Sequence, residues 1–211
     1  MLLELLSREY GRVGLVARGA RAAKSRWRNR LQPFRPLLLD WSQRGELGTL
    51  TGAEEVATLP PLRGEALMCG LYANELLVRF LHRSDPHSEV FDHYRQLVAS
   101  LSAGDQVQPL LRLFERDVLT AVGLGLQLDT EHGGGEEIDA GAWYEYQPDS
   151  GPVRRQPSER ENLRLVSGAA LIALRSGQIE AETQRELKML MRHVIRYHLG
   201  DKPLASHDLF R

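Results

Sequence analysis

The sequence predicts an α+β protein in which a small β-domain precedes a bundle of helices. Residues 1–55 contain short apolar or alternating runs separated by turn signals, a pattern typical of strands. From residue 64 onward apolar residues recur every three to four positions, which is typical of amphipathic helices. Pro60 and Pro61 lie where the two patterns meet and mark a boundary. We therefore expect one domain at residues 1–57 and a second at residues 62–211.

Four short strands are expected in the first domain. They are Leu2–Leu6, Val13–Ala17, Leu37–Trp41 and Glu46–Leu50. Short strands joined by loops favour a small barrel or sandwich over a βαβ unit.

Five helices are expected in the second domain, joined by short loops into a compact bundle. The first begins at Gly64 and ends before Pro86, and the others are Ser88–Leu101, Pro109–Val122, Ser158–Leu174 and Glu182–Leu199. Ser158 and Glu161 have the spacing of a capping box, which predicts the start of the fourth helix. Residues 124–157 form an irregular insertion in which the aromatic run Trp143–Tyr146 is a candidate strand.

The composition is that of an ordinary globular protein. The 211 residues include 27 Lys+Arg and 28 Asp+Glu, with 42% hydrophobic and 26% charged residues. No apolar run approaches the roughly 20 residues of a membrane helix, and the N-terminus lacks the pattern of a secretory signal. The single cysteine, Cys69, excludes an internal disulfide and fits a reducing compartment. We expect a cytoplasmic protein with no membrane partner.

The charges are segregated along the chain. The stretch from Tyr10 to Leu39 contains eight cations and no acidic residue: Arg12, Arg18, Arg21, Lys24, Arg26, Arg28, Arg30 and Arg35. A cationic loop held between two strands suits a polyanion, because arginine grips phosphate in a bidentate fork and releases condensed counterions. The predicted DNA-binding residues are Arg12, Arg18, Arg21, Lys24, Arg26, Arg28 and Arg30. A plain solvated surface loop is the alternative.

Trp27 lies within this basic stretch and has two interpretations. It stacks on an exposed base, or it packs against Pro33 or Phe34 and shapes the loop. The second interpretation is favoured.

Catalytic motifs find no support in the sequence. It contains no G-x-S-x-G, no Walker phosphate loop and no H-E-x-x-H, and one cysteine cannot form a cysteine-based zinc site. His193 and His198 are five residues apart on a helix, so their side chains diverge by roughly 140° and are poor co-ligands. We expect a protein that is not an enzyme, with no catalytic residue, no cofactor and no metal.

The segment around Arg112 is more informative. Arg112 and Arg116 are four residues apart and are expected to share one exposed face of the third predicted helix. Two arginines beside apolar helix surface suit an acidic peptide with an apolar end. The alternative, left open by the sequence, is that both pair with Glu115 or with a neighbouring helix.

Several motifs in order resemble the bacterial recombination mediator family RecO. They are Gly11-Arg-Val-Gly-Leu-Val-Ala-Arg-Gly-Ala-Arg with Lys24-Ser25, Leu31-Gln-Pro-Phe, Gly45-Glu-Leu-Gly-Thr-Leu, Gly70-Leu-Tyr-Ala-Asn-Glu-Leu, Arg112-Leu-Phe-Glu and Gly200-Asp-Lys-Pro-Leu with Leu209-Phe-Arg. The resemblance implies an N-terminal OB fold, a helical C-terminal domain, binding of single- and double-stranded DNA and strand annealing. It also implies binding of the acidic C-terminal tail of single-stranded DNA-binding protein (SSB), here assigned to Arg112 and Arg116, and work with RecR to load RecA at the nucleoid.

The sequence departs from this family pattern in two places. It opens inside what should be the second strand, so the barrel is expected to lack its first strand. The stretch Leu128–Trp143 has none of the four cysteines that hold zinc in some relatives. The sequence thus predicts a DNA-repair mediator. The alternatives are an interaction adaptor whose basic loop is incidental, and a metal-dependent nuclease, for which no carboxylate cluster is visible near that loop.

Overall fold

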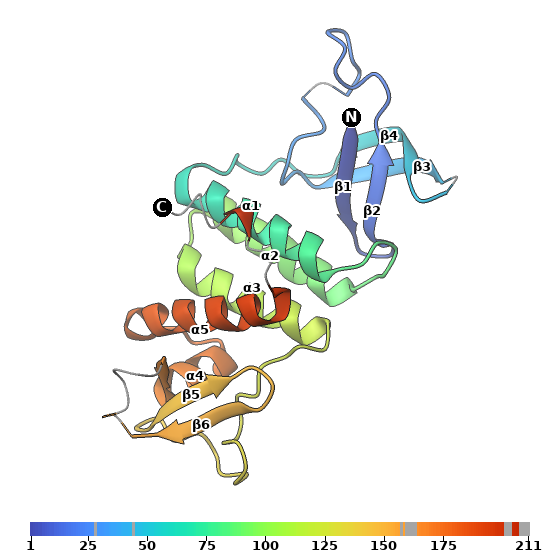
Figure 1. The fold of residues 1–211 in the computed structure, drawn as a ribbon. Coiled ribbons are helices and arrows are strands. Elements are labelled where there is room, and N and C mark those ends of the chain that lie inside the picture. Colours follow the sequence, from blue (N-terminus) through green and yellow to red (C-terminus); the bar gives the residue numbers. More distant parts are fainter. Residues whose placement is uncertain (28, 44, 157, 159–163, 201–203, 207–211) are drawn as a thin grey trace. The chain divides into compact units, whose positions relative to one another are not determined.

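The computed structural model describes residues 1–211 except 28, 44, 157, 159–163, 201–203 and 207–211. The chain divides into two compact units, Met1–Asp105 and Gln106–Arg211. Within the described residues, the first unit holds a four-stranded sheet and two helices, and the second holds three helices and a three-stranded sheet (Figure 1). The first two predicted helices therefore belong to the same compact unit as the N-terminal sheet.

The N-terminal sheet has the strand order β1-β2-β4-β3. Its strands are β1 (Leu2–Ser7), β2 (Gly11–Val16), β3 (Leu37–Gln43) and β4 (Gly48–Glu55). Antiparallel pairs join β1 to β2 and β3 to β4, whereas β2 and β4 pair in parallel at Leu15 with Gly48 and Val16 with Thr49. Among the described residues β1 and β3 are not paired with each other, so both are edges of the sheet.

The start of β4 differs from the predicted strand Glu46–Leu50. It begins two residues later, at Gly48, where the chain meets β2 and β3 at close range. A Cβ added to Gly48 would lie 2.6 Å from Leu15 Cδ2 and 2.9 Å from Trp41 Cδ1. Only glycine fits this approach without a shift of its neighbours, so the strand pairing is set by steric room as well as by the apolar pattern.

One hydrophobic cluster fills the core beside this sheet. Its buried members are Val13, Leu15, Ala17, Trp27, Leu50 and Ala53. Gly48 and Leu50 of β4 are buried two positions apart, the period expected when one sheet face is covered, and Ala53 follows three positions on, past the register shift between β3 and β4. Trp27 comes from the loop after β2, so this loop is anchored in the core by its own side chain.

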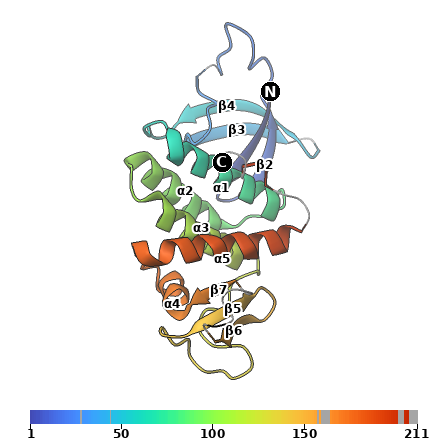
Figure 2. The same cartoon turned by 60° about the vertical axis from the view of Figure 1, so that its left-hand side comes forward.

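Two helices complete the first unit. They are α1 (Gly64–Phe80) and α2 (Ser88–Ala103), which run side by side next to the sheet (Figures 1 and 2). Gly104 ends α2 in the left-handed conformation, and its amide donates to the carbonyl of Ser100, which is the usual role of a C-terminal glycine. Both helices match the sequence prediction closely.

The second unit combines α3 (Val107–Ala121), α4 (Gly168–Ser176) and α5 (Ala181–Leu199) with a small antiparallel sheet. Its strands are β5 (Trp143–Gln147), β6 (Gly151–Arg155) and β7 (Leu165–Ser167), in the order β6-β5-β7 (Figure 2). Tyr144 and Tyr146 are buried and alternate with half-buried neighbours along β5. The prediction of a strand in this aromatic run is therefore confirmed.

The predicted helix Ser158–Leu174 is wrong at Leu165–Ser167, where the chain forms a strand. Its capping-box partner Glu161 lies outside the described residues, and the chain forms β7 before the helix begins at Gly168. Ser167 is the actual N-cap, because its side chain accepts a hydrogen bond from the amide of Ala170 at 3.2 Å. A local sequence signal was outweighed here by pairing of β7 with β5, a contact that is distant in sequence.

No helix in the described part of the chain is long and apolar enough to cross a membrane.

Candidate nucleic-acid interface

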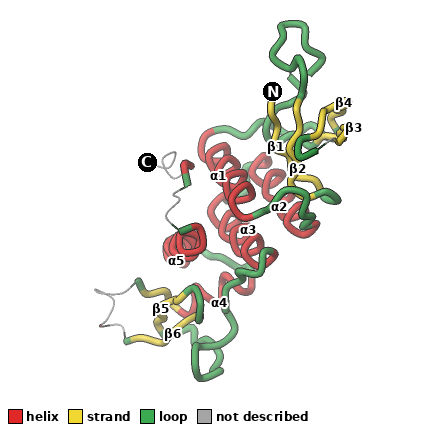
Figure 3. Tube along the Cα trace, turned by 45° about the vertical axis from the view of Figure 1, so that its right-hand side comes forward, coloured by secondary structure: helices red, strands yellow, loops and turns green. Residues whose placement is uncertain are grey.

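Residues 17–36, which join β2 to β3, form the basic loop, which extends from the strands of the first unit (Figure 3). It folds as consecutive tight turns: the amide of Ala22 donates to the carbonyl of Gly19, and the amide of Ser25 donates to the carbonyl of Ala22. Gly19 has a φ of 68°, in the left-handed region that glycine adopts without strain. The turns therefore give the loop a defined path.

Three cations of the loop lie free on its surface. Arg18, Arg21 and Lys24 are exposed, and none of their side chains forms a hydrogen bond or ion pair with a residue that the structure describes. Long cationic side chains that face water and have no acidic neighbour are the groups that bind phosphates best, because no internal partner must be displaced. These three residues are the centre of the candidate interface.

Arg26 and Arg30 have a second role. Arg26 Nη2 donates to the carbonyl of Thr51 at 3.1 Å, and Arg30 Nη1 donates to the carbonyl of Ala53 at 3.3 Å. Both carbonyls belong to β4, so the two side chains tie the loop to the sheet. Each remains an exposed residue whose charge is not neutralised by these bonds. Arg28, which was also predicted to bind DNA, lies outside the described residues.

Trp27 fixes the middle of the loop. Its ring is 5% exposed and belongs to the core cluster, and its indole N–H donates to the carbonyl of Arg18 at 3.2 Å. The guanidinium carbon of Arg26 lies 4.2 Å from the ring centroid, a cation–π distance. The favoured interpretation of Trp27 as a packing residue agrees with this burial, although its cluster is the sheet core. A stacking role on an exposed base does not fit a ring that is covered on this scale.

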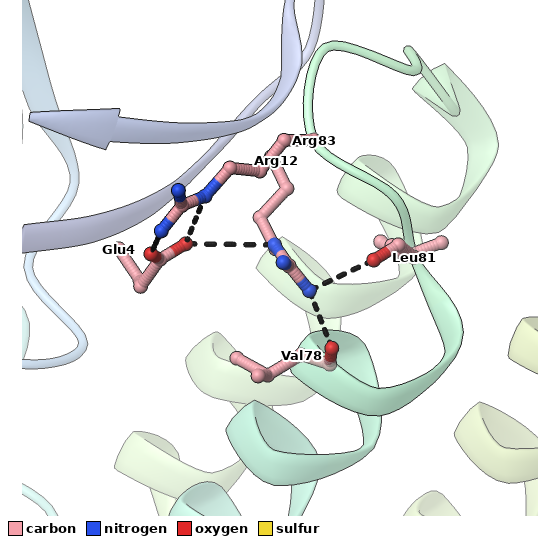
Figure 4. A network of polar contacts seen from close by, with 5 residues as sticks. All are labelled: Glu4, Arg12, Val78, Leu81 and Arg83. Carbon is pink, nitrogen blue, oxygen red and sulfur yellow. Dashed lines mark hydrogen bonds and ion pairs between the residues drawn. The ribbon is translucent and has the colours of Figure 1, made fainter. Parts of the chain in front are cut away.

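Arg12 lies apart from the loop cations, at the end of α1. Its Nη1 donates to the carbonyls of Val78 and of Leu81, the latter at 2.8 Å, and its Nε lies 3.5 Å from Glu4 Oε2 (Figure 4). Arg83 pairs with the same carboxylate. A cation beside the last carbonyls of a helix satisfies orphan acceptors and stabilises the helix dipole. The structure thus gives Arg12 a structural position that its sequence neighbourhood did not reveal.

A pocket of about 420 Å³ lies beside the end of the basic loop, within the first unit. Its lining residues are Asn29, Gln32, Pro33, Phe34, Arg35, Leu59, Pro60, Pro61, Leu62, Leu67 and Leu71. The wall is mainly apolar, with two amide side chains and one arginine, and its volume falls within the usual range for small-ligand sites. The sequence pattern did not predict this pocket, because its walls come from three separate segments.

Phe34 and Gly70 determine one wall of this pocket. Phe34 has a φ of 64°, an unusual conformation for an aromatic residue. A Cβ added to Gly70 on α1 would lie 2.8 Å from Phe34 Cε1 and 2.8 Å from Leu62 Cδ1. The bare backbone of α1 at Gly70 therefore makes the room in which the Phe34 ring is held. Both residues belong to motifs that the sequence singled out, and their contact explains why the two motifs go together.

The predicted exposed face of Arg112 and Arg116 is wrong. Arg112 is buried at 5% exposure and its Nη2 lies 3.1 Å from Glu115 Oε1. Arg116 Nη1 donates to the carbonyls of Leu174 and Arg175 at the end of α4, and its Nη2 lies 2.7 Å from Asp117 Oδ1. The open alternative, pairing with Glu115 and with a neighbouring helix, describes both side chains. The physical reason is that Arg112 has an acid one turn along the same helix and Arg116 meets the last carbonyls of α4.

Metal chemistry has no visible basis in the described residues. No group of three or more histidine, cysteine, aspartate or glutamate side chains is close enough to hold an ion there. Cys69 is buried.

Comparison with known families decides the identity. The model described as "Recombination protein O N terminal" matches residues 1–59, and the model described as "Recombination protein O C terminal" matches residues 62–208. The chain belongs to the RecO family. The family and the α+β fold class predicted from the motifs are thereby confirmed, with the β-rich OB-like region first and the helices after it.

Individual RecO relatives support the assignment over nearly the full chain. A protein named DNA repair protein RecO from Nitrosococcus oceani is 46% identical over 209 residues, which cover 99% of this chain and 85% of the relative. The protein of the same name from Methylococcus capsulatus is 43% identical over 212 residues, covering 100% of this chain and 86% of the relative. The protein of the same name from Aromatoleum aromaticum is 42% identical over 212 residues, which cover 100% of this chain and 88% of the relative.

Proposed function

We propose that this RecO-family chain is a DNA-binding mediator of recombinational repair. The observation that carries the proposal is the cluster of Arg18, Arg21 and Lys24, three exposed cations without an internal partner among the described residues, on a loop anchored by Trp27. The loop grips the phosphate backbone, which gives affinity for single- and double-stranded DNA of any sequence. Arg26 and Arg30 add charge from positions fixed on β4.

The pocket beside the loop adds a contact that only unpaired DNA offers. An apolar wall with an aromatic ring and two amides suits a nucleobase, since every base has a face that stacks and an edge that forms hydrogen bonds. Asn29, Gln32 and Phe34 are the lining residues with these properties. In a duplex the bases are stacked inside, so this pocket favours single strands, whereas the basic loop serves both forms.

The partners of the proposed function follow from the family. The chain binds SSB-coated DNA through the acidic SSB tail, anneals complementary strands and works with RecR to load RecA at the nucleoid. No bond is made or broken, so the protein acts as a mediator and not as an enzyme. Arg112 and Arg116 remain the residues to test for the tail, with one constraint from the geometry: a tail carboxylate reaches Arg112 only if the Arg112–Glu115 pair opens.

Reversal of the three free cations tests DNA binding. In the variant Arg18→Glu/Arg21→Glu/Lys24→Glu, affinity for unrelated sequences falls to a similar extent. The slope of log K against log salt flattens by about 0.7 for each single-strand phosphate that the variant no longer neutralises. Arg18→Lys/Arg21→Lys keeps the charge and serves as the matched control. Fluorescence anisotropy at several salt concentrations gives both quantities.

The same measurement separates the alternative function, an interaction adaptor. An adaptor with an incidental basic loop shows no salt-dependent DNA binding in the wild-type chain. Unchanged affinity and slope in the triple reversal would show that the basic loop is not the binding site.

A further inference from the structure

The outer face of α5 carries a row of cations that the basic loop does not account for. Arg185, Lys188, Arg192 and Arg196 follow one another at spacings of three, four and four residues. On a helix of 3.6 residues per turn they fall within an arc of about 80°, so they form one straight stripe about 16 Å long. We call these four residues the α5 stripe.

The stripe is rigid and accessible. The opposite face of α5 is buried through Leu187, Leu190, Met191, Val194 and Ile195, which fixes the helix on its own unit. All four residues of the stripe are exposed, and none of their side chains has a hydrogen bond or ion pair to any residue within the described ranges. A surface helix normally mixes charges so that neighbours pair along it, whereas this face shows one sign only.

Acidic residues of the helix lie to one side of the stripe. Glu186 is occupied by the amide of Ser167, which donates to its Oε2 at 2.7 Å. Glu182 stands at the N-terminal end of the helix, where a carboxylate is favoured by the helix dipole. The four cations therefore keep their charge for an external partner.

We propose that the α5 stripe binds the phosphate backbone of a second nucleic-acid strand, independently of the basic loop. A linear row of three arginines and a lysine complements a linear row of phosphates, and arginine pairs with each phosphate through two parallel N–H donors. The stripe lies on Gln106–Arg211 and the loop on Met1–Asp105, so each compact unit carries one polyanion site. The inference deepens the proposed function, on which it rests: a chain that anneals strands must hold two of them.

The test uses the full chain and short single-stranded oligonucleotides. The stripe variant is Arg192→Glu/Arg196→Glu, and Arg192→Lys/Arg196→Lys is its charge-keeping control. The wild type and the control bind two oligonucleotides per chain, while the stripe variant binds one and anneals complementary strands at least about tenfold more slowly. Its salt slope falls by about 1.4, the value for two single-strand phosphates that are no longer neutralised. Thermal unfolding equal to that of the control shows that the fold is kept.

The loop reversal described above separates this inference from the proposed function. If the stripe binds independently, the loop variant still binds one oligonucleotide, and a chain with both reversals binds none. A loop variant that loses both oligonucleotides overturns the independent second site. The same result still supports the proposal that the wild-type loop binds DNA. A stripe variant that keeps both oligonucleotides but loses an acidic peptide overturns the inference in favour of a protein partner.

Discussion

Arg112 Nη2 lies 3.1 Å from Glu115 Oε1 within α3, where 6% of the arginine side chain and 0% of the glutamate side chain are exposed. Arg112 Nε is also buried and has no hydrogen-bond partner in the described part of the chain. Moving a charge pair out of water costs several kcal/mol per ion in desolvation. The attraction between the two charges offsets this cost only while both members are present. Arg112 and Glu115 should therefore be treated as one buried ion pair of α3.

The first prediction follows from this pairing. Arg112→Ala lowers the free energy of unfolding by about 3–5 kcal/mol, because it removes one member of a buried ion pair. Arg112→Leu/Glu115→Leu removes both charges and is much less destabilised. Urea unfolding measures both changes, and Arg175→Ala is the control, since its ion pair with Asp129 is exposed and contributes at most about 1 kcal/mol. A near-neutral Arg112→Ala would contradict the pairing argument.

The same variants decide whether Arg112 serves the SSB tail. Titration of a tail peptide into Arg112→Leu/Glu115→Leu, a folded chain without this arginine, separates the two roles. Binding lower than that of the wild type by about 1–3 kcal/mol supports a charge-assisted contact to the peptide. Wild-type affinity in the double variant moves the tail site away from Arg112.

The second prediction concerns Arg12, which bridges β2 and α1. Arg12→Ala removes the donors to the carbonyls of Val78 and Leu81 and one cation beside Glu4. We expect a loss of stability of about 1–3 kcal/mol, the scale of a charged hydrogen bond, with DNA affinity close to that of the wild type. Urea unfolding and anisotropy on the same preparation measure the two effects. A variant that unfolds normally but loses DNA affinity would return Arg12 to the DNA interface.

Strands and helices with a strong apolar period were predictable from the sequence, because one buried face imposes the period directly. Most strand bounds in the first unit and both of its helices agree with the prediction to within a few residues. The helix predicted from Ser158 is wrong over Leu165–Ser167, because β7 pairs there with β5, an interaction that no local window contains. The local pattern therefore predicts whether a segment is a helix or a strand. Where a segment can either start a helix or join the edge of a sheet, contacts with residues distant in the sequence decide which one forms.

The candidate site was predictable in its charge but not in its geometry. The absence of acids around Arg18 and Arg21 is a property of the sequence itself. That Arg12 would turn to the end of α1, or that Phe34 would meet Gly70, depends on residues tens of positions away. The local sequence around Arg112 is the same whether this side chain is buried in an ion pair or exposed to solvent. Its burial is therefore known only from the structure.

The third prediction is a loss of stability at alkaline pH. The pKa of Tyr146 is raised to about 12, mainly because the side chain is buried. The hydrogen bond that the backbone amide of Gln127 donates to the Tyr146 hydroxyl oxygen acts in the opposite direction and is the smaller effect. The unfolded tyrosine has a pKa of about 10, so the folded chain holds this proton longer. Stability from this group is complete below pH 10 and is lost as pH rises toward 12. The difference amounts to at most about 3 kcal/mol.

Urea unfolding between pH 8.5 and 11.5, as approximate limits, checks this dependence against a matched variant. Tyr146→Phe is less stable at neutral pH, because the backbone amide of Gln127 loses its part-buried acceptor, but its stability falls less steeply above pH 10. Parallel curves for the two chains would assign the alkaline loss to other groups.

The fourth prediction tests the base-binding role of the pocket beside the basic loop. Leu67 lines this pocket and is 37% exposed, whereas Val78 lies on the same helix, is 45% exposed and does not line it. Leu67→Trp fills the pocket, and Val78→Trp is the matched control for adding an indole to α1. The wild type and the control are expected to bind an ordinary single strand at least about fivefold more tightly than an abasic strand of equal length, the lower end of base–aromatic stacking. In Leu67→Trp this preference disappears while affinity for the abasic strand stays unchanged, because the basic loop still holds the phosphates.

A preference for the ordinary strand that persists in Leu67→Trp would place base recognition outside this pocket. Weaker binding of both strands would mean that the added ring distorts the loop.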